Sequence, residues 1–197
     1  MPNWCNNSVE IYHTDPAMIE RARKAFNGEG LLQEFIPVPQ ELIDTVSGFV
    51  PEQEALEAKQ AANREKYGYS SWYDFCVGEW GTKWEIGADG NPAQDIPGGL
   101  MLGFDSAWSP PIAAYEKLFY MGFRIRAMYY EPGMAFAGVW EDGADDYYEY
   151  GGMNSDQIAE ELPVELDEAF GISEQVAEYE AENQEIELNE GIDSINE

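Results

Sequence analysis

Few side chains in this sequence combine a reactive type with a spacing that could support catalysis. The single histidine, His13, ends a segment of alternating apolar residues, where a lone imidazole more often has a structural role than acts as a general base. Cys5 and Cys76 have no adjacent histidine or basic cluster to stabilise a thiolate. No serine lies in a nucleophile elbow, and no glycine-rich loop has phosphate-binding spacing. We therefore predict that the protein is not an enzyme and has neither catalytic residues nor a cofactor.

Paired carboxylates are the other candidate for chemistry. Glu141 and Asp142, with Asp145 and Asp146, form the segment EDGADD, which is rich in the hard oxygen ligands that Ca²⁺ prefers. The segment lacks the ligand ladder and the terminal glutamate of an EF-hand loop. Acidic residues are also so abundant along the chain that their pairing carries little information. The sequence therefore predicts an acidic loop without a metal site.

Charge is distributed very unevenly along the chain. The formal net charge is −29, and the last basic residue is Arg126. Residues 127–197 contain 21 of the 39 acidic residues and none of the ten lysines and arginines. A field of this sign repels nucleic acid and anionic membranes and attracts basic surfaces. We therefore expect no direct contact with nucleic acid or membrane, and we expect a basic protein as the partner.

The acidic segment has a pattern that a purely solvating tail does not need, although solvation is the usual role of a charge block. Glu174, Glu178 and Glu182 follow a helical i, i+4, i+8 row, and Glu161, Glu165 and Glu168 form another. Like charges at this spacing cost about 0.2–0.5 kcal/mol per pair unless a cation binds them. Tyrosines are interleaved with the acids. The residues expected to contact a basic partner are Asp145, Asp146, Tyr147, Tyr148, Glu160, Glu161, Glu165, Asp167, Glu168, Glu174, Glu178 and Glu182.

Tryptophans offer an alternative binding surface. Trp80, Trp84 and Trp108 lie in short motifs where they could form a core site for a protein or a small molecule. Aromatic clusters also stack on bases, but the net charge disfavours nucleic acid as the ligand. Core packing is the favoured interpretation of these residues, and an exposed tryptophan at a protein interface stays open as an alternative.

Periodicity indicates the elements that position these residues. A strand at 6–13 precedes a helix at 14–26, which begins with Asp15 as N-cap and Pro16 at its first position. Residues 31–42 predict a loop with a short strand, and 44–69 a helical insertion, with a further helix starting at Ser70 or Ser71. Strands are expected at 82–86 and 99–108, a helix at 109–123 with Ser109 as its cap, and a hairpin at 123–141 whose type II turn has Pro132 and Gly133 at its centre.

The order strand–helix–strand–strand–helix–strand, with one further hairpin strand, predicts an α+β ferredoxin-like sandwich over residues 1–144. Its helices cover one face of an antiparallel sheet, and the other face is at least partly wet. Residues 141–152 are expected to form a loop. Residues 145–197 form an acidic extension of one or two helices, in which Leu162, Leu166 and Phe170 could dock weakly and the last ten or so residues fray.

The sequence predicts a cytoplasmic protein. It contains no apolar run of about 18 residues that could span a membrane, and its start, MPNWCNNSVEIYH, lacks the basic region and apolar block of a secretory signal. Two cysteines without a framework spacing are expected to stay reduced in that compartment.

Four stretches together resemble the YubB-like proteins of bacteriophages and conjugative plasmids. They are MPNWCNN at the start, WGTKW at 80–84, FDSAWSPP at 104–111 and YYEPGMAFAG at 129–138. The resemblance covers residues 1–141 and implies a ferredoxin-like fold and an origin in a mobile element. It implies no activity, and it does not extend to the acidic segment.

These observations lead to two hypotheses from different classes. In the first, the protein imitates nucleic acid and occupies the basic groove of a host defence protein, such as a restriction or CRISPR nuclease. A row of glutamates places carboxylates about 6 Å apart, so two or three adjacent rows with loop carboxylates would approach the charge spacing of a duplex. In the second, it is a non-enzymatic accessory protein of a phage or plasmid that binds its partner through Trp80, Trp84 and Trp108.

Overall fold

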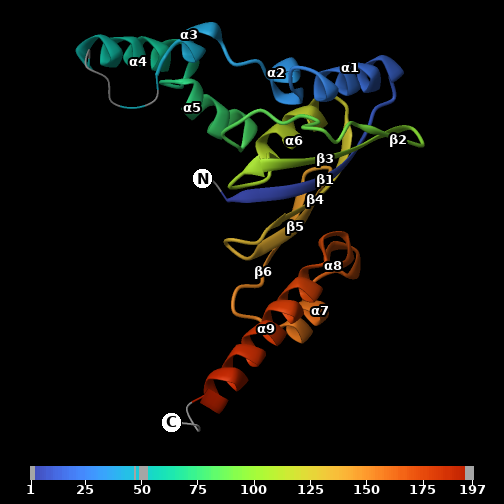
Figure 1. Ribbon diagram of the computed structural model, residues 1–197. Coiled ribbons are helices and arrows are strands. Elements are labelled where there is room, and N and C mark those ends of the chain that lie inside the picture. Colours follow the sequence, from blue (N-terminus) through green and yellow to red (C-terminus); the bar gives the residue numbers. More distant parts are fainter. Residues whose placement is uncertain (1–2, 47, 49–52, 194–197) are drawn as a thin grey trace.

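The computed structural model describes residues 3–46, 48 and 53–193. Helices and strands combine in a mixed α+β arrangement (Figure 1). In chain order the elements are β1 (Trp4–Tyr12), α1 (Pro16–Asn27), α2 (Leu31–Phe35), α3 (Gln40–Ile43), α4 (Gln53–Tyr67), α5 (Trp72–Phe75), the π-helical turn η1 (Cys76–Trp80), β2 (Gln94–Ile96), β3 (Gly99–Ala107), α6 (Ile112–Tyr120), β4 (Arg124–Glu131), β5 (Phe136–Glu141), β6 (Ala144–Glu149), α7 (Ser155–Glu161), α8 (Val164–Phe170) and α9 (Ile172–Asp193).

The strands form one open antiparallel sheet of six strands in the order β2-β3-β1-β4-β5-β6. Strand β1 lies inside it and pairs with β3 from Trp4↔Ala107 to Tyr12↔Gly99, and with β4 from Asn6↔Tyr130 to Tyr12↔Arg124. The predicted α+β class and antiparallel sheet are confirmed. The N-terminal end of β1 and the C-terminal end of β3 therefore meet at one end of the sheet.

The larger hydrophobic core lies between one face of the sheet and helices α1, α2 and α6 (Figure 1). Alternate residues of β1, β3, β4 and β5 point into it, as the period of two requires. In helix α1, Asp15 is the N-cap, as predicted, and accepts a hydrogen bond from the amide of Ala17 (2.9 Å); Ala22 and Phe26 are buried. The strand residues in this core are Cys5, Val9, Ile11, Leu100, Leu102, Ile125, Ala127, Tyr129, Phe136 and Trp140.

A second hydrophobic cluster lies on the opposite face, where α7, α8 and the start of α9 cover β4 and β5 (Figure 1). Tyr130 and Ala137 point into it from the strands. The helices contribute the buried residues Ile158, Leu162, Leu166 and Ile172. The acidic segment is therefore packed as part of the fold, more firmly than the weak docking expected from its sequence, and it covers part of the face that was expected to be wet.

The expected loop at 141–152 is wrong, because residues 144–149 form the edge strand β6. Asp142 and Gly143 both have positive φ (45° and 104°) and connect β5 to β6 in two residues. Positive φ at both positions defines a type I′ turn, whose twist matches that of the flanking strands. The predicted boundary after residue 144 therefore lies at the start of β6, and the sheet continues to Glu149.

Three further expectations for the first 141 residues are wrong. Residues 31–42 contain helix α2 and most of helix α3, and Pro37 and Pro39 lie between the two helices. Residues 82–86 are irregular, and the second strand is β2 inside the turn-rich segment that follows. The predicted type II turn is also wrong, because Gly133 has no positive φ and the left-handed residue of the 131–136 turn is Ala135 (φ 56°). The Glu131 carboxylate holds this turn by accepting hydrogen bonds from the amides of Gly133 and Met134.

Helix termini in the second half also differ from the predictions. Helix α6 starts after Pro111, and the Ser109 hydroxyl donates instead to the carbonyl of Gly81 (2.7 Å). The N-cap of α7 is Asn154, which forms a capping box with Gln157. Helix α9 continues to Asp193 through the segment expected to fray, and residues 194–197 lie outside the described residues. Within the described chain, no helix is both long and apolar enough to cross a membrane.

Truncating the buried side chain of α8 should loosen the acidic helices from the sheet. We expect Leu166→Ala to lower the free energy of unfolding by about 2–5 kcal/mol, because it opens a cavity in the second cluster. Val164→Ala, on the exposed face of the same helix, should change it by less than about 0.5 kcal/mol. Urea unfolding followed by tryptophan fluorescence measures both. Equal effects of the two substitutions would show that α8 is not anchored through Leu166.

Candidate functional site

Three tryptophans form an exposed row at the end of the sheet where β1 begins. Trp4 lies 5.8 Å from Trp84 between ring centroids, and Trp84 stacks on Trp108 at 6.2 Å. Their exposed fractions are 46%, 38% and 44%. Because large indole rings are normally well buried, three neighbours that each expose more than a third are typical of a binding surface. We call Trp4, Trp84 and Trp108 the aromatic ledge.

The ledge and the predicted tryptophan site share Trp84 and Trp108 and differ in their third member. Trp80 is buried and its indole N–H donates to the carbonyl of Ile36 (2.9 Å), so it belongs to the core as packing predicted. Trp4 joins Trp84 and Trp108 instead. Residue spacing could not predict this contact, because Trp4 reaches Trp84 only through the pairing of β1 with β3 and the loop packed beside it.

The backbone around the ledge is unusual at three points. Trp108 has a left-handed conformation (φ 64°), which is costly for a bulky residue, and its amide donates to the carbonyl of Asn3 (2.9 Å). The turn η1 precedes Gly81, and π-helical turns are frequent at functional sites. Gly81 has φ 80°, and a Cβ there would lie 3.1 Å from the amides that begin α6. Tight packing at Gly81 and the hydrogen bond from the Trp108 amide thus hold this backbone in place despite the strain at Trp108.

A cationic side chain of the protein itself, Lys83, lies over the ledge. The Lys83 ammonium lies 4.7 Å from the ring centroid of Trp84, 5.3 Å from that of Trp108 and 5.7 Å from that of Tyr73. Such distances allow cation–π attraction. The sequence motif WGTKW contained this lysine beside Trp84, but only the fold shows that it lies over two further rings.

Hollows open on both flanks of the ledge. The larger one, of about 680 Å³, is bordered by Trp4 and Trp84 and by the acidic residues Glu85, Asp89 and Asp105. A smaller one, of about 400 Å³, lies between Trp108 and Tyr147 and includes Asp145. Neither hollow is lined by a lysine or an arginine in the part of the chain that the structure describes. Both therefore combine aromatic rings with acidic side chains.

Glu85 forms one wall of the larger hollow in a fixed position. Its carboxylate accepts from the amides of Leu32 (2.6 Å), Gln33 (2.6 Å) and Ile86 (2.9 Å), so it caps the N-terminus of α2. Burial raises the pKa of this carboxyl above its ordinary value, and the three amides oppose that shift. The close approach explains Gly30, where a Cβ would meet the Glu85 side chain at 2.1 Å.

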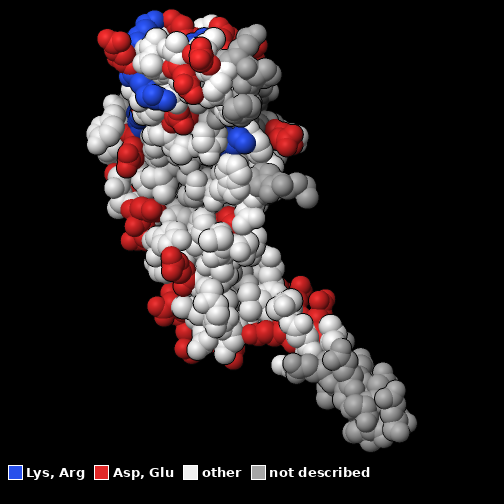
Figure 2. All heavy atoms as spheres, turned by 90° about the vertical axis from the view of Figure 1, so that its left-hand side faces the viewer, with Lys and Arg blue, Asp and Glu red and all other residues white. Residues whose placement is uncertain are grey.

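The predicted acidic surface is divided among three helices. Glu174, Glu178 and Glu182 lie exposed along the single helix α9, so this row is confirmed. The second predicted row is wrong, because the chain leaves the helical conformation at Leu162 and places Glu161 on α7 and Glu165 and Glu168 on α8. Glu160, Glu161 and Glu168 are exposed. On the face shown in Figure 2, the lower part of the molecule carries acidic but no basic side chains, and lysine and arginine side chains appear only in the upper part.

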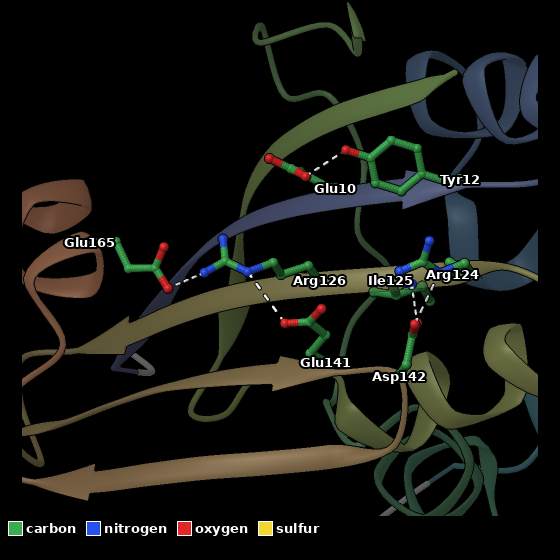
Figure 3. A network of polar contacts seen from close by, with 8 residues as sticks. All are labelled: Glu10, Tyr12, Arg124, Ile125, Arg126, Glu141, Asp142 and Glu165. Atoms are coloured by element: carbon green, nitrogen blue, oxygen red, sulfur yellow. Dashed lines mark hydrogen bonds and ion pairs between the residues drawn. The ribbon is translucent and has the colours of Figure 1, made fainter. Parts of the chain in front are cut away.

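Two members of the predicted set have internal roles. Asp167 accepts from the amide (2.7 Å) and the hydroxyl (2.5 Å) of Ser173, and so caps the first turn of α9. Glu165 pairs with Arg126, which reaches from β4 between Glu165 on one side and Glu141 on the other (Nε–O 3.5 Å; Figure 3). Arg126 therefore ties α8 to the sheet. These contacts leave Asp167 and Glu165 less available to a partner than the sequence suggested.

The four residues of the expected acidic loop do not form one patch. On the edge strand β6, Asp145 and Tyr147 share one face and Asp146 and Tyr148 the other. Asp145 accepts from the hydroxyl of Tyr129 (2.7 Å), whose ring crosses β5 at Gly138; a Cβ on that glycine would lie 2.2 Å from the hydroxyl oxygen. Tyr148 packs against the second cluster. Asp145 and Tyr147 therefore belong to the flank of the aromatic ledge.

The candidate catalytic groups occupy structural positions. The Nδ1 atom of His13 accepts from the amide of Asp15 (2.9 Å), and its ring packs on Phe123 at 4.9 Å. Cys5 and Cys76 are buried free thiols. Among the described residues, no group of three or more His, Cys, Asp or Glu side chains is arranged to hold a metal ion.

Neither a family model nor a curated protein matches the chain. Among solved structures, it is similar to the protein api92 from Yersinia pseudotuberculosis, which is described with the family model DUF1281. The two share 14% sequence identity over 77% of this chain and 99% of that one, with a TM-score of 0.43. A likeness at this level assigns neither a family nor a function.

The left-handed backbone of Trp108 should reverse the usual order of alanine and glycine. We expect Trp108→Gly to be more stable than Trp108→Ala by about 1 kcal/mol, because glycine adopts positive φ without steric cost. The matched pair Trp84→Ala and Trp84→Gly should show the ordinary order, with alanine at least as stable. Chemical unfolding of the four variants measures both differences. An alanine variant at position 108 as stable as its glycine counterpart would contradict the strain.

Both thiols should be inert in the folded protein. Burial raises the pKa of Cys5 and of Cys76 to about 12, so the thiolate fraction at pH 8 is roughly 10⁻⁴. We expect no labelling by iodoacetamide within an hour at pH 8, and labelling of both residues after unfolding in guanidinium, as read by intact mass. Rapid labelling of either thiol in the native protein would reopen a nucleophilic role.

Proposed function

We propose that this protein is a non-enzymatic inhibitor whose acidic helices occupy the basic groove of a nucleic-acid-binding protein and exclude nucleic acid from it. The observation that carries the proposal is the burial of Ile158, Leu162, Leu166 and Ile172 against the sheet, while glutamates of the same helices stay exposed: Glu160, Glu161, Glu168, Glu174, Glu178 and Glu182. A tail that only solvates needs no such anchor. Anchored helices present carboxylates at fixed positions, which lowers the entropy lost on binding.

Charge supports the same conclusion. Within the described residues, Glu174, Glu178 and Glu182 make no ion pair, and along α9 their spacing sets like charges against one another. Binding to a groove built for phosphates would relieve this repulsion. The broken second row and the divided β6 residues reduce the regularity of the imitation, so the proposal concerns a dense acidic surface and not a copy of duplex geometry.

The strand order supports the ferredoxin-like part of the proposal. Strands β1 and β2 both lie antiparallel to β3 and on either side of it, and β3 and β4 flank β1 in the same way. Two such interlocked units, each crossing over through helices, make the split β-α-β arrangement of that fold. Together with the resemblance to the YubB-like proteins, this favours a mobile-element protein and, as its target, a host defence nuclease of the restriction or CRISPR type.

A second candidate function is binding through the aromatic ledge, as an accessory protein of a phage or plasmid. Three exposed indoles, of which Trp84 contacts both of the others, favour it, because tryptophan side chains dominate the energy of many protein interfaces. Trp80, which the sequence placed in this site, is core and takes no direct part.

Neutralising the α9 row should abolish binding to a groove-type partner. We expect Glu174→Gln/Glu178→Gln/Glu182→Gln to lose a nucleic-acid-binding protein that the unmodified chain captures from bacterial lysate. The triple variant Glu54→Gln/Glu57→Gln/Glu65→Gln on α4 makes the same change in net charge and should retain it. A short DNA duplex, or a rise from about 50 to 500 mM salt, should release the captured protein. The captured protein is identified by mass spectrometry.

Two outcomes would count against the mimic. Retention of the partner by the α9 variant would move the working surface to the ledge, in agreement with the second candidate. Binding that is insensitive to salt and to duplex DNA would show that the partner does not use a phosphate-binding groove. Truncation after residue 144 is a poor substitute for these variants, because it removes β6 and the helices that cover β4 and β5.

A further inference from the structure

We propose that the larger hollow beside the aromatic ledge binds an arginine side chain of a protein partner. This inference rests on the second candidate function and is independent of the acidic helices. It names the chemistry of the ligand, which neither the sequence nor the resemblance supplied.

The lining of the hollow combines two kinds of side chain. Trp4 and Trp84 provide indole rings, and the loop at 87–91 and strand β3 contribute Asp89 and Asp105. Asp105 accepts from the side-chain amide of Asn6 (2.6 Å), which fixes the carboxylate and leaves its second oxygen for another donor. The volume of about 680 Å³ is within the range of about 300–1000 Å³ that is usual for ligand sites.

The loop that carries Asp89 is held against the core. Asp89 and Gly90 both have positive φ (36° and 88°), which makes a tight turn at the rim. On its near side the Ala88 amide donates to the carbonyl of Phe26 (2.9 Å), and on its far side the Asn91 side chain donates to the carbonyl of Gly103 (3.4 Å). Hydrogen bonds therefore hold this loop at both ends in the absence of a partner.

The lining selects a cation. It contains three acidic side chains and no basic one, so an anion such as a nucleotide would meet repulsion. A neutral apolar group would leave the carboxylates desolvated without a donor. Lys83 shows that the ledge holds a cation, since its ammonium already lies over Trp84 and Trp108 outside this hollow. A cation from a partner would find the same attraction at Trp4 and the inner side of Trp84.

Arginine fits this arrangement better than lysine. Its planar guanidinium stacks on an indole ring while its edge donates to a carboxylate, and it is more weakly hydrated than an ammonium. Both kinds of group line the same hollow, the indoles of Trp4 and Trp84 and the carboxylate of Asp105. A basic protein that approaches the acidic chain would carry such side chains on its surface.

The test uses the full chain and small ligands that carry at most one charge, so that general attraction to the acidic helices contributes little. N-acetyl-arginine methylamide is titrated while the indole N–H signals of the six tryptophans are followed by NMR, with assignments from single Trp→Phe variants. We expect saturable shifts of the Trp4 and Trp84 signals, and none at the buried Trp80 and Trp140. The lysine analogue should bind several-fold more weakly, and the uncharged citrulline analogue and adenosine should give no saturable shift.

Isosteric variants locate the site. Asp105→Asn should weaken arginine binding by about fivefold, the loss of roughly 1 kcal/mol expected for a partly exposed charged contact. Glu116→Gln, an exposed acid on α6, removes the same charge elsewhere and should have no effect. The Glu174→Gln/Glu178→Gln/Glu182→Gln variant should bind arginine unchanged, which separates this result from the fate of the mimic.

Three outcomes would overturn the proposal. An equal response to citrulline would mean apolar binding without charge recognition, and a stronger response to adenosine would identify a base-stacking surface. Arginine binding that survives Asp89→Asn/Asp105→Asn at full strength would place the cation elsewhere.

Discussion

Strands β4 and β5 bury side chains on both faces of the sheet, and the rest of the molecule is arranged around that constraint. Neighbouring residues Tyr129 and Tyr130 point into opposite clusters, and so do Phe136 and Ala137. One face is covered by α1, α2 and α6, so the other required a second cover that the first 150 residues do not provide. Helices α7 and α8 supply it, which is why the acidic segment is built into the fold.

An acidic cover has an electrostatic cost that the structure limits in two ways. First, its apolar residues Ile158, Leu162, Leu166 and Ile172 are buried together, so that apolar burial anchors the cover. Second, Arg126 bridges Glu141 and Glu165 where α8 meets the sheet (Figure 3). Arg124 pairs with Asp142 (3.2 Å), so the last two basic residues of the chain, both on β4, each neutralise acidic side chains of neighbouring elements. The acids farther along α9 have no such counterpart among the described residues.

Much of the fold was predictable because its signals are local. The strand at β1, helix α1, the β4–β5 hairpin and the α+β class follow from periodicity and caps. Strand β6 was missed although Asp142-Gly143 is a strong turn signal, because the surrounding acids suggested a solvated loop. The second strand was misplaced because 82–86 has the apolar pattern of a strand but is needed as a loop to hold Trp84 and Glu85. The aromatic ledge could not be predicted, since it depends on the β1–β3 register and on a left-handed Trp108.

Under both proposals the protein recognises positive charge, but at two different ranges. The helical glutamates act through a long-range field, which raises the rate of encounter and weakens steeply with salt. The ledge acts only on contact, through rings and carboxylates that must fit one side chain, and such contacts govern dissociation and specificity. Asp145 and Tyr147 stand on the ledge side of β6, and Asp146 and Tyr148 on the helical side. The edge strand therefore joins the two surfaces, and a partner that bound both would have to pass over it.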